Sequence, residues 1–215
     1  MDILLPKIYP ITDTAISGLS HTEQVEQLLQ GGATLIQLRD KVAPPRSFLN
    51  DAKNAFRAAR AAGAKLLIND RVDIALALDA DGVHLGQFDM PVEAARRLLG
   101  DRAIIGFSTH DIERARHALT LPIDYLAFGP VYSTETKQNP DPIVGLKALG
   151  EVKEMAGSLP VVAIGGIDES RVHDVLMAGA DSIAIISALL APPSDIAEKL
   201  RNLADITRKP FATAR

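Results

Sequence analysis

The stretch LLINDRVDIALALDADGVHLGQFDMP, residues 66–91, contains two short apolar runs that each lead into an amide and then a carboxylate. Asn69 and Asp70 follow the first run, and Gln87 and Asp89 follow the second. A short apolar run flanked by turn residues is typical of a strand buried in a parallel sheet. A short helix fits between the two runs, so the stretch predicts a strand–helix–strand unit.

The same succession of amphipathic helix, glycine and short apolar strand recurs along the chain, as in LLQGGATLIQL, RAAGAKLLIND and MAGADSIAII. Glycine ends a helix because it adopts the left-handed conformation without strain. Eight such pairs without a linker in 215 residues favour an α/β fold, a single (β/α)8 TIM barrel over residues 1–215, rather than an open doubly wound sheet. The expected strands are Ile8–Thr12, Thr34–Leu38, Lys65–Ile68, Gly82–Leu85, Ala103–Phe107, Tyr125–Phe128, Val161–Ile164 and Ser182–Ile186. The expected helices are His21–Gln30, Arg46–Ala61, Arg71–Leu78, Pro91–Leu99, Ile112–Leu119, Gly145–Ala156, Glu169–Ala178 and Ser194–Thr207.

Helix starts carry recognisable signals. Ser20 and Glu23 form the pattern of a capping box, in which each side chain bonds the other's backbone N–H. Asp111 and Asp168 are expected to be N-caps, and Pro91 the first residue of its helix.

Composition narrows the classes of function. Apolar residues make up 47% of the chain and charged residues 23%, as in globular proteins. The net charge of −4 argues against non-specific nucleic-acid binding, which depends on basic patches. The absence of cysteine excludes disulfides and thiolate metal sites. We expect a cytoplasmic protein, because no apolar run is long enough to span a membrane and no signal-peptide pattern is present. The sequence does not decide the oligomeric state.

Polar residues gather where the expected strands end. Asp70 and Asp89 leave the same ends of neighbouring parallel strands, which lie about 4.8 Å apart. Two such carboxylates can share one Mg²⁺, an ion that prefers oxygen ligands and keeps waters or substrate phosphates as further ligands. The sequence therefore predicts a magnesium site here.

A phosphate site is expected across the same face. Gly165 and Gly166 follow the seventh strand and Ser187 the eighth, the positions where barrels commonly bind phosphate with backbone N–H groups. A tight turn is the alternative explanation for the two glycines. The polar segment 129–143 is longer than most loops in such barrels, and we expect Tyr132–Asp141 to act as a lid.

Basic residues accompany the acids. Arg39, Lys41 and Lys137 join Asp70 and Asp89 on this face, and the combination indicates a metal-bound polyphosphate. A surface salt-bridge network is the alternative.

The five histidines show no metal-ligand spacing. His84 is expected to be a hydrogen-bonded histidine inside the barrel. Solvated or capping roles are expected for His21, His110, His117 and His173.

The chain resembles the thiamine-phosphate synthase family. The resemblance is carried by QLRDK (37–41), residues 68–91, GFSTH (106–110), DYLAFGPVYSTETK (124–137), VVAIGGI (161–167) and GADSIAIISAL (179–189). It implies a (β/α)8 barrel that couples 4-amino-5-hydroxymethyl-2-methylpyrimidine diphosphate to thiazole phosphate, giving thiamine phosphate and diphosphate by substitution through a carbocation.

The resemblance also implies roles for individual residues. Asp70 and Asp89 would ligate Mg²⁺. The diphosphate would be held by Arg39, Lys41, Asn69 and Lys137, and the pyrimidine by Gln37 and Ser108. The groups acting in catalysis would be Arg39, Lys41, Lys137 and Ser108. The thiazole phosphate would be bound by Thr134, Thr136, Gly166, Ile186 and Ser187.

Three other functions remain open at this stage. A related thiazole tautomerase shares the barrel but is expected to lack the paired aspartates and the diphosphate-binding residues. A Schiff-base aldolase would need a lysine on a strand, and Lys65 starts its strand at the wrong end while Lys41 lies past its strand's end. A non-catalytic phosphate-binding protein would not need an activated leaving group.

Overall fold

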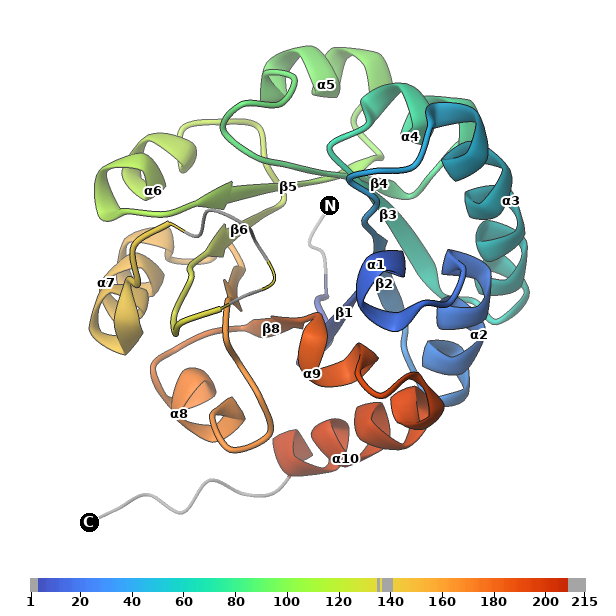
Figure 1. Cartoon of the computed structure of the whole chain (residues 1–215). Helices are drawn as coiled ribbons and strands as arrows, with labels where there is room; N and C mark the ends of the chain where they lie inside the picture. Colours follow the sequence, from blue (N-terminus) through green and yellow to red (C-terminus); the bar gives the residue numbers. More distant parts are fainter. Residues whose placement is uncertain (1–3, 135, 137–140, 209–215) are drawn as a thin grey trace.

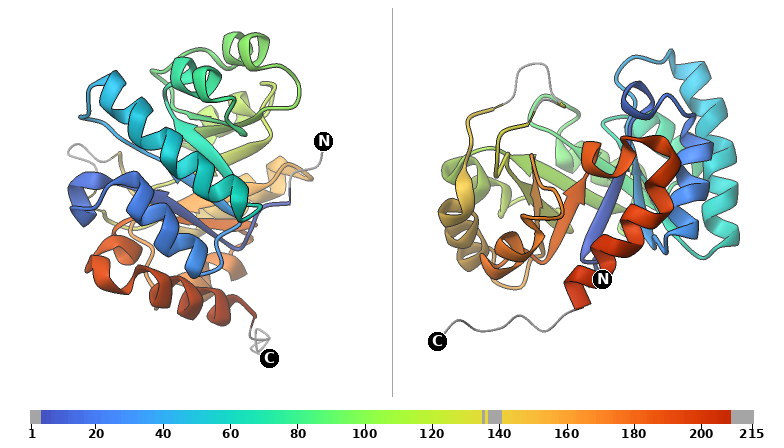
Figure 2. Two further views of the ribbon diagram at one scale, coloured as in Figure 1. Left: turned by 90° about the vertical axis from the view of Figure 1, so that its right-hand side faces the viewer. Right: turned by 60° about the horizontal axis from the view of Figure 1, so that its bottom comes forward.

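Eight parallel strands form a closed barrel, and their order around the barrel is their order in the chain. The computed structural model describes residues 4–134, 136 and 141–208. β1 pairs with β8, so the sheet has no free edge, and the helices surround it (Figure 1). The predicted (β/α)8 barrel is confirmed. Two further views of the chain show the strands inside and the helices outside (Figure 2).

The elements alternate as expected. The strands are β1 (Ile8–Thr12), β2 (Leu35–Leu38), β3 (Lys65–Asn69), β4 (Gly82–Leu85), β5 (Ile104–Thr109), β6 (Tyr125–Phe128), β7 (Val161–Ile164) and β8 (Ser182–Ile185). The helices are α1 (Thr14–Ser17), α2 (His21–Gln30), α3 (Pro45–Ala61), α4 (Val72–Leu78), α5 (Val92–Leu99), α6 (Ile112–Ala118), α7 (Gly145–Ala156), α8 (Val172–Met177), α9 (Ser187–Leu190) and α10 (Ile196–Arg208), with the 3₁₀ turn η1 (Pro193–Asp195) before α10.

Two strands extend further than the sequence predicts. β3 includes Asn69, which is in register with His84 on β4. β5 continues through Ser108 and Thr109, which stay in register with β6. Asn69 and Ser108 are therefore strand residues held by the barrel rather than residues of loops.

Two short helices were not predicted, α1 and α9. Each is a single turn placed directly after a strand, too short for a periodic apolar pattern. The capping box of α2 is confirmed, as is the Asp111 N-cap of α6, whose side chain accepts from the Arg114 N–H.

Two helix-start predictions were wrong. Pro91 is the N-cap residue of α5 rather than its first helical residue. Asp168 does not cap α8, because that helix begins at Val172. The Asp168 carboxylate instead accepts from the Ser170 N–H at 3.0 Å and closes a turn.

The core has two layers. A large one lies between the sheet and the helices. A smaller one fills the barrel axis, and its members are Tyr9, Ile11, Leu35, Leu67, Ile104, Tyr125, Ala127, Val162 and Ala184. Alternation of side chains along each strand produces the two layers. The inner layer forms the floor beneath the strand ends.

Aspartates at the N-terminal ends of three strands bond the backbone of a neighbouring strand. Asp81, Asp124 and Asp181 precede β4, β6 and β8, and each accepts an N–H from the strand before. The bonds run from Leu66 N (2.9 Å), Ile105 N (2.7 Å) and Val161 N (2.8 Å), respectively. These aspartates therefore fasten the bottom of the barrel.

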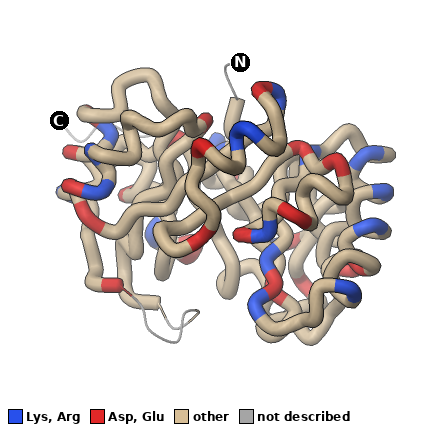
Figure 3. Tube along the Cα trace, turned by 90° about the horizontal axis from the view of Figure 1, so that it is seen from above, with Lys and Arg blue, Asp and Glu red and all other residues tan. Residues whose placement is uncertain are grey.

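Acidic and basic residues are mixed over the chain rather than separated by sign (Figure 3). Within the described ranges, none of the helices has the length and apolar character required to cross a bilayer.

Candidate active site

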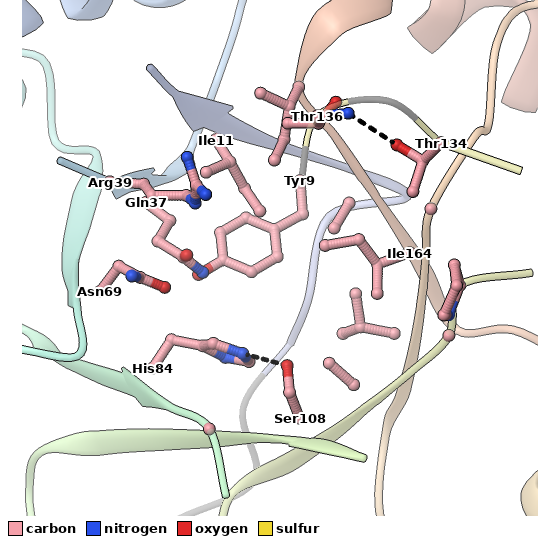
Figure 4. Close-up of a pocket in the computed structure, with 18 of the residues that line it drawn as sticks. Tyr9, Ile11, Gln37, Arg39, Asn69, His84, Ser108, Thr134, Thr136 and Ile164 are labelled. Atoms are coloured by element: carbon pink, nitrogen blue, oxygen red, sulfur yellow. Dashed lines mark hydrogen bonds between the residues drawn. The ribbon is translucent and has the colours of Figure 1, made fainter. Parts of the chain in front are cut away.

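A cavity of about 360 Å³ opens at the C-terminal ends of the strands. Lys137 lies outside the described residues. Every other predicted site residue lines the cavity, namely Gln37, Arg39, Lys41, Asn69, Asp70, Asp89, Ser108, Thr134, Thr136, Gly166, Ile186 and Ser187. In Figure 4, Gln37 and Arg39 lie on one side of it and Thr134 and Thr136 on another.

The two predicted magnesium ligands, Asp70 and Asp89, line the same cavity, and the charge of Asp70 acts on the pKa of Asp89. Burial raises the pKa of Asp89, and the neighbouring carboxylate of Asp70 raises it further through a hydrogen bond and like charge. The Gly86 N–H, which donates to Asp89 Oδ2 at 2.6 Å, acts in the opposite direction on this pKa. Two neighbouring carboxylates repel each other when both are ionised, and a divalent cation relieves that repulsion.

The backbone of Asp70 is strained at this position. Its φ angle of 62° lies in the left-handed region, which is strained for a residue with a side chain. Its N–H donates to the His84 carbonyl at 2.8 Å, so the neighbouring strand holds it in place. Strain at such a position is a common feature of functional sites.

Two of the predicted cations, Lys41 and Arg39, are paired with acids rather than free. Lys41 Nζ forms an ion pair with Asp70 Oδ2, and its side chain is 51% exposed. Arg39 pairs with Asp13, whose side chain also caps α1. Both cations point into the cavity region and are available to exchange an acid for a phosphate.

Asn69 contributes an unpaired donor. Its residue is 8% exposed, and its Nδ2 is buried without a hydrogen-bond partner among the described residues. A buried amide without a partner is destabilising by about 1–3 kcal/mol, and an anionic ligand in the cavity would remove that penalty.

The opposite wall is formed by the loops after β7 and β8. Gly165 and Gly166 have φ angles of 101° and 63°. A Cβ at Gly165 would lie 2.4 Å from Pro130 Cβ, and one at Gly166 would lie 2.2 Å from the Ser133 carbonyl oxygen. Glycine is therefore required by the packing of this turn, whether or not a phosphate binds.

A second, shallower hollow adjoins the cavity on this side, and both are lined by Thr134, Thr136, Gly166 and Ser187. Arg171 lines the hollow and donates to the Gly166 carbonyl. Its guanidinium carbon lies 4.6 Å from the ring centre of Tyr132. Ser187 begins α9. This wall can accept an anion by backbone N–H groups and hydroxyls.

Sequence reasoning missed part of the cavity floor. Tyr9, Tyr125 and His84 line it. Burial raises the pKa of Tyr9 to about 12 and that of Tyr125 well above its usual range, and burial lowers the pKa of His84 to about 4. All three are uncharged near neutral pH. His84 is hydrogen-bonded inside the barrel as predicted.

Two of the other histidines differ from the prediction. His21 is not solvated, since it is 1% exposed and contacts Thr12 Oγ1 at 2.7 Å and Asp40 Oδ2 at 3.2 Å. His110 lines the cavity, where it joins the Gly129 carbonyl at 2.5 Å and Asp141 at 3.5 Å. Neither role has a local signal in the sequence, because the partners of each histidine lie nine or more positions away from it.

A family model described as thiamine monophosphate synthase matches residues 8–189. The chain belongs to the thiamine monophosphate synthase family. The predicted family resemblance is confirmed, and the thiamine-phosphate synthase relatives indicate a transferase of thiamine biosynthesis.

Known relatives cover nearly the whole chain. A thiamine-phosphate synthase of Chloroflexus aurantiacus is 42% identical over 206 residues, 94% of each chain. One of Clostridium novyi is 44% identical over 201 residues, 93% of this chain and 98% of that one. Among solved structures, a thiamine phosphate pyrophosphorylase of Pyrococcus furiosus is 39% identical with a TM-score of 0.83, covering 93% of this chain and 94% of that one.

Proposed function

We propose that the protein couples 4-amino-5-hydroxymethyl-2-methylpyrimidine diphosphate to thiazole phosphate in a Mg²⁺-dependent reaction that gives thiamine phosphate and diphosphate. Family membership supports thiamine phosphate synthesis. The substrates and the metal are our proposal, as is the cytoplasm as its compartment. The observation that carries it is that Asp70 and Asp89 line one cavity together with Arg39 and Lys41.

The donor set fits Mg²⁺ bound together with a substrate. Within the described ranges, no three His, Cys, Asp or Glu side chains gather to hold a metal by themselves. A pair of carboxylates leaves most positions of an octahedral ion to water and phosphate oxygens, which is how Mg²⁺ is usually bound in phosphate chemistry. The bound ion would supply charge neutralisation for the diphosphate.

The residues around the pair would bind the rest of the diphosphate. Lys41 and Arg39 would exchange their carboxylate partners for phosphate oxygens, and Asn69 Nδ2 would gain an acceptor. Lys137, outside the described residues, is proposed for the same task. Gln37 and Ser108 would contact the pyrimidine from the floor. The thiazole phosphate would bind on the opposite wall, at Thr134, Thr136, Gly166, Ile186 and Ser187.

The proposed reaction breaks the bond between the pyrimidine methylene carbon and the diphosphate oxygen, and the bonding pair leaves with the diphosphate. The thiazole nitrogen then donates its lone pair to the methylene carbon. No protein nucleophile takes part. The chain contributes positioning and fixed charges: Arg39, Lys41, Lys137 and Ser108 are the proposed catalytic groups.

Water must be kept away from the cationic carbon, because it would form the alcohol. The Tyr132–Asp141 loop is our candidate lid, although part of it lies outside the described residues. Proteolysis of this loop should slow when both substrates are present, and an unchanged rate would remove the lid from the proposal.

The competing functions receive less support. A tautomerase acting by proton transfer has no diphosphate to hold, and so it does not need Lys41 and Arg39 beside the two carboxylates. An aldolase needs a lysine whose ammonium loses its proton easily, which burial promotes, whereas Lys41 is half exposed and ion-paired. It is the one lysine among the described residues lining the cavity. A binding protein would show tight ligand binding without diphosphate release.

The decisive experiment measures diphosphate release with both substrates and Mg²⁺, alongside a chelated control and reactions lacking either substrate. We expect release only in the complete reaction. Release that persists in chelator would remove the metal from the proposal, and no release in any condition would remove the reaction itself. Borohydride trapping of a lysine adduct would instead support the aldolase.

A further inference from the structure

A continuous chain of hydrogen bonds crosses the cavity floor and connects the two residues proposed to hold the pyrimidine. Gln37 Nε2 donates to Tyr9 Oη at 3.0 Å. The Tyr9 and Tyr125 hydroxyls are 3.1 Å apart, and the Tyr125 hydroxyl lies 2.8 Å from His84 Nδ1. His84 Nε2 lies 2.7 Å from Ser108 Oγ. We call these five side chains the floor relay. Figure 4 shows the Gln37 and Tyr9 end and the His84 and Ser108 end.

The floor relay is built rigidly into the barrel. Tyr9 is 1% exposed and Tyr125 is fully buried, and their rings meet edge to face at 6.0 Å. The His84 ring stacks on Tyr125 at 5.5 Å. A Cβ at Gly106 would lie 2.0 Å from Tyr125 Cζ, so the strand beside the ring has space for it only because residue 106 is glycine. The hydroxyls are therefore held in place by packing rather than by the ligand.

The order of donors and acceptors follows from the first bond. An amide nitrogen can only donate, so the Tyr9 oxygen accepts from Gln37. The Tyr125 hydroxyl is the one other partner of Tyr9 Oη among the described residues, so the buried Tyr9 hydroxyl satisfies its own proton by donating to Tyr125. The Tyr125 proton then goes to His84 Nδ1, which must be unprotonated to accept it. A neutral imidazole carries its proton on the other nitrogen, so His84 Nε2 donates to Ser108 Oγ.

This order leaves one unused hydrogen-bond donor and one unused acceptor facing the cavity. The Ser108 hydroxyl proton is not used by the relay and can be donated to a ligand. Among the described residues, no hydrogen-bond donor pairs with the side-chain oxygen Oε1 of Gln37, whose Nε2 is used by Tyr9, so Oε1 can accept from a ligand. The two ends of the relay thus present an acceptor at Gln37 and a donor at Ser108.

We propose that the floor relay sets the substrate specificity of the site, with Tyr9, Tyr125 and His84 as positioning residues that select an aminopyrimidine over an oxopyrimidine. This proposal rests on the proposed function for the identity of the ligand. An exocyclic amino group donates and an unprotonated ring nitrogen accepts, which matches Gln37 and Ser108. In the 4-oxo analogue the exocyclic group accepts and a ring nitrogen carries a proton, so both contacts are mismatched.

The first test needs neither substrate nor activity. Nitrogen NMR of the histidine-labelled protein, with His84→Gln used to assign the signals, reports which ring nitrogen is protonated. We expect a neutral His84 with its proton on Nε2. A proton on Nδ1 would reverse the order of donors along the relay and overturn the proposal, whatever reaction the protein catalyses.

The second test breaks the relay at its centre. Tyr125→Phe keeps the ring that packs against Gly106 but removes the hydroxyl, so the His84 proton can move to either nitrogen. We compare kcat/KM for the 4-amino pyrimidine diphosphate with that for its 4-oxo analogue. We expect their ratio to fall by at least about tenfold, with a higher KM for the pyrimidine diphosphate and an unchanged KM for thiazole phosphate. Tyr9→Phe should act in the same direction, and it replaces Tyr125→Phe if that variant does not fold.

A matched pair of histidine variants controls for general damage. His84→Gln should lower the ratio, whereas His117→Gln, on the exposed face of α6, should leave it unchanged. An equal loss of kcat on both pyrimidines with an unchanged ratio in the relay variants would mean that the relay is structural only, and would overturn the proposal. If the wild-type protein releases no diphosphate at all, the proposed function fails, and the NMR result still decides the order of donors in the relay.

Discussion

Aspartates lie at both ends of the barrel strands, but their surroundings differ. At the N-terminal ends, Asp81, Asp124 and Asp181 each accept a backbone N–H. At the C-terminal ends, Asp70 and Asp89 line the same cavity, and burial raises the pKa of Asp89, with a further rise from the neighbouring Asp70. The same residue type stabilises the fold at one end and opposes its own ionisation at the other. An acid that the protein leaves poorly compensated is a better indication of function than an acid at a conspicuous position.

The largest expected effect is the loss of catalysis when one of the two cavity aspartates loses its charge. Asp89→Asn keeps an oxygen to accept the Gly86 N–H but removes the charge. We expect turnover at saturating Mg²⁺ to fall at least about 100-fold, while binding of thiazole phosphate, measured by calorimetry, stays nearly unchanged. A variant with wild-type turnover at the same Mg²⁺ concentration would disprove the metal assignment.

At the opposite end the expected effect is on stability. Asp124→Ala leaves the Ile105 N–H without its acceptor and Arg96 without its partner at 2.7 Å. We expect the free energy of unfolding in urea to fall by about 2 kcal/mol, with kcat unchanged in the folded protein. A loss of kcat with unchanged stability would contradict the assignment of stability to the N-terminal ends of the strands and of catalysis to their C-terminal ends.

Between the two ends, His84 should make stability depend on pH. Burial lowers its pKa from 6.5 to about 4, so between these values the folded protein binds fewer protons than the unfolded chain. The free energy of unfolding should therefore rise with pH across this window, by up to about 1.4 kcal/mol per pH unit. Denaturation series at several pH values measure the slope. His84→Gln should flatten it and His117→Gln should not; equal slopes in the two variants would assign the effect to other groups.

The smallest expected effect is the gain in thermal stability when Mg²⁺ binds without substrate. Without substrate, Mg²⁺ at ten times its Kd should stabilise the folded protein by about 1.4 kcal/mol, which raises Tm by about 3–6 °C for a domain of this size. Calorimetric scans with and without chelator measure it. Asp124→Ala should keep the shift and Asp89→Asn should lose it, so a shift that survives in Asp89→Asn would place the ion elsewhere.

The sequence was sufficient for the barrel and for the cavity rim, because both follow from local patterns. Short apolar runs define the strands, and the residues that follow them, such as Asp70 and Gly166, must lie on one face of a parallel barrel. The boundaries were less accurate, since Asn69 and Ser108 remain paired with neighbouring strands beyond the apolar runs.

The floor was not predictable in the same way. Tyr9 and Tyr125 are separated by 116 positions and meet only because the barrel closes, so no spacing in the sequence connects them. His21 similarly reaches Asp40 through the packing of α2 beside the end of β2. A glycine in β5, at position 106, was the available signal, and its meaning depends on the ring that it faces.

The left-handed backbone of Asp70 has a practical consequence for engineering. Glycine would relax that conformation, so a library screened for heat tolerance alone should enrich Asp70→Gly and discard the carboxylate without any sign of damage to the fold. Consensus or computational redesign of this scaffold should therefore keep Asp70. A gain in heat stability from replacing it would come with the loss of a proposed Mg²⁺ ligand.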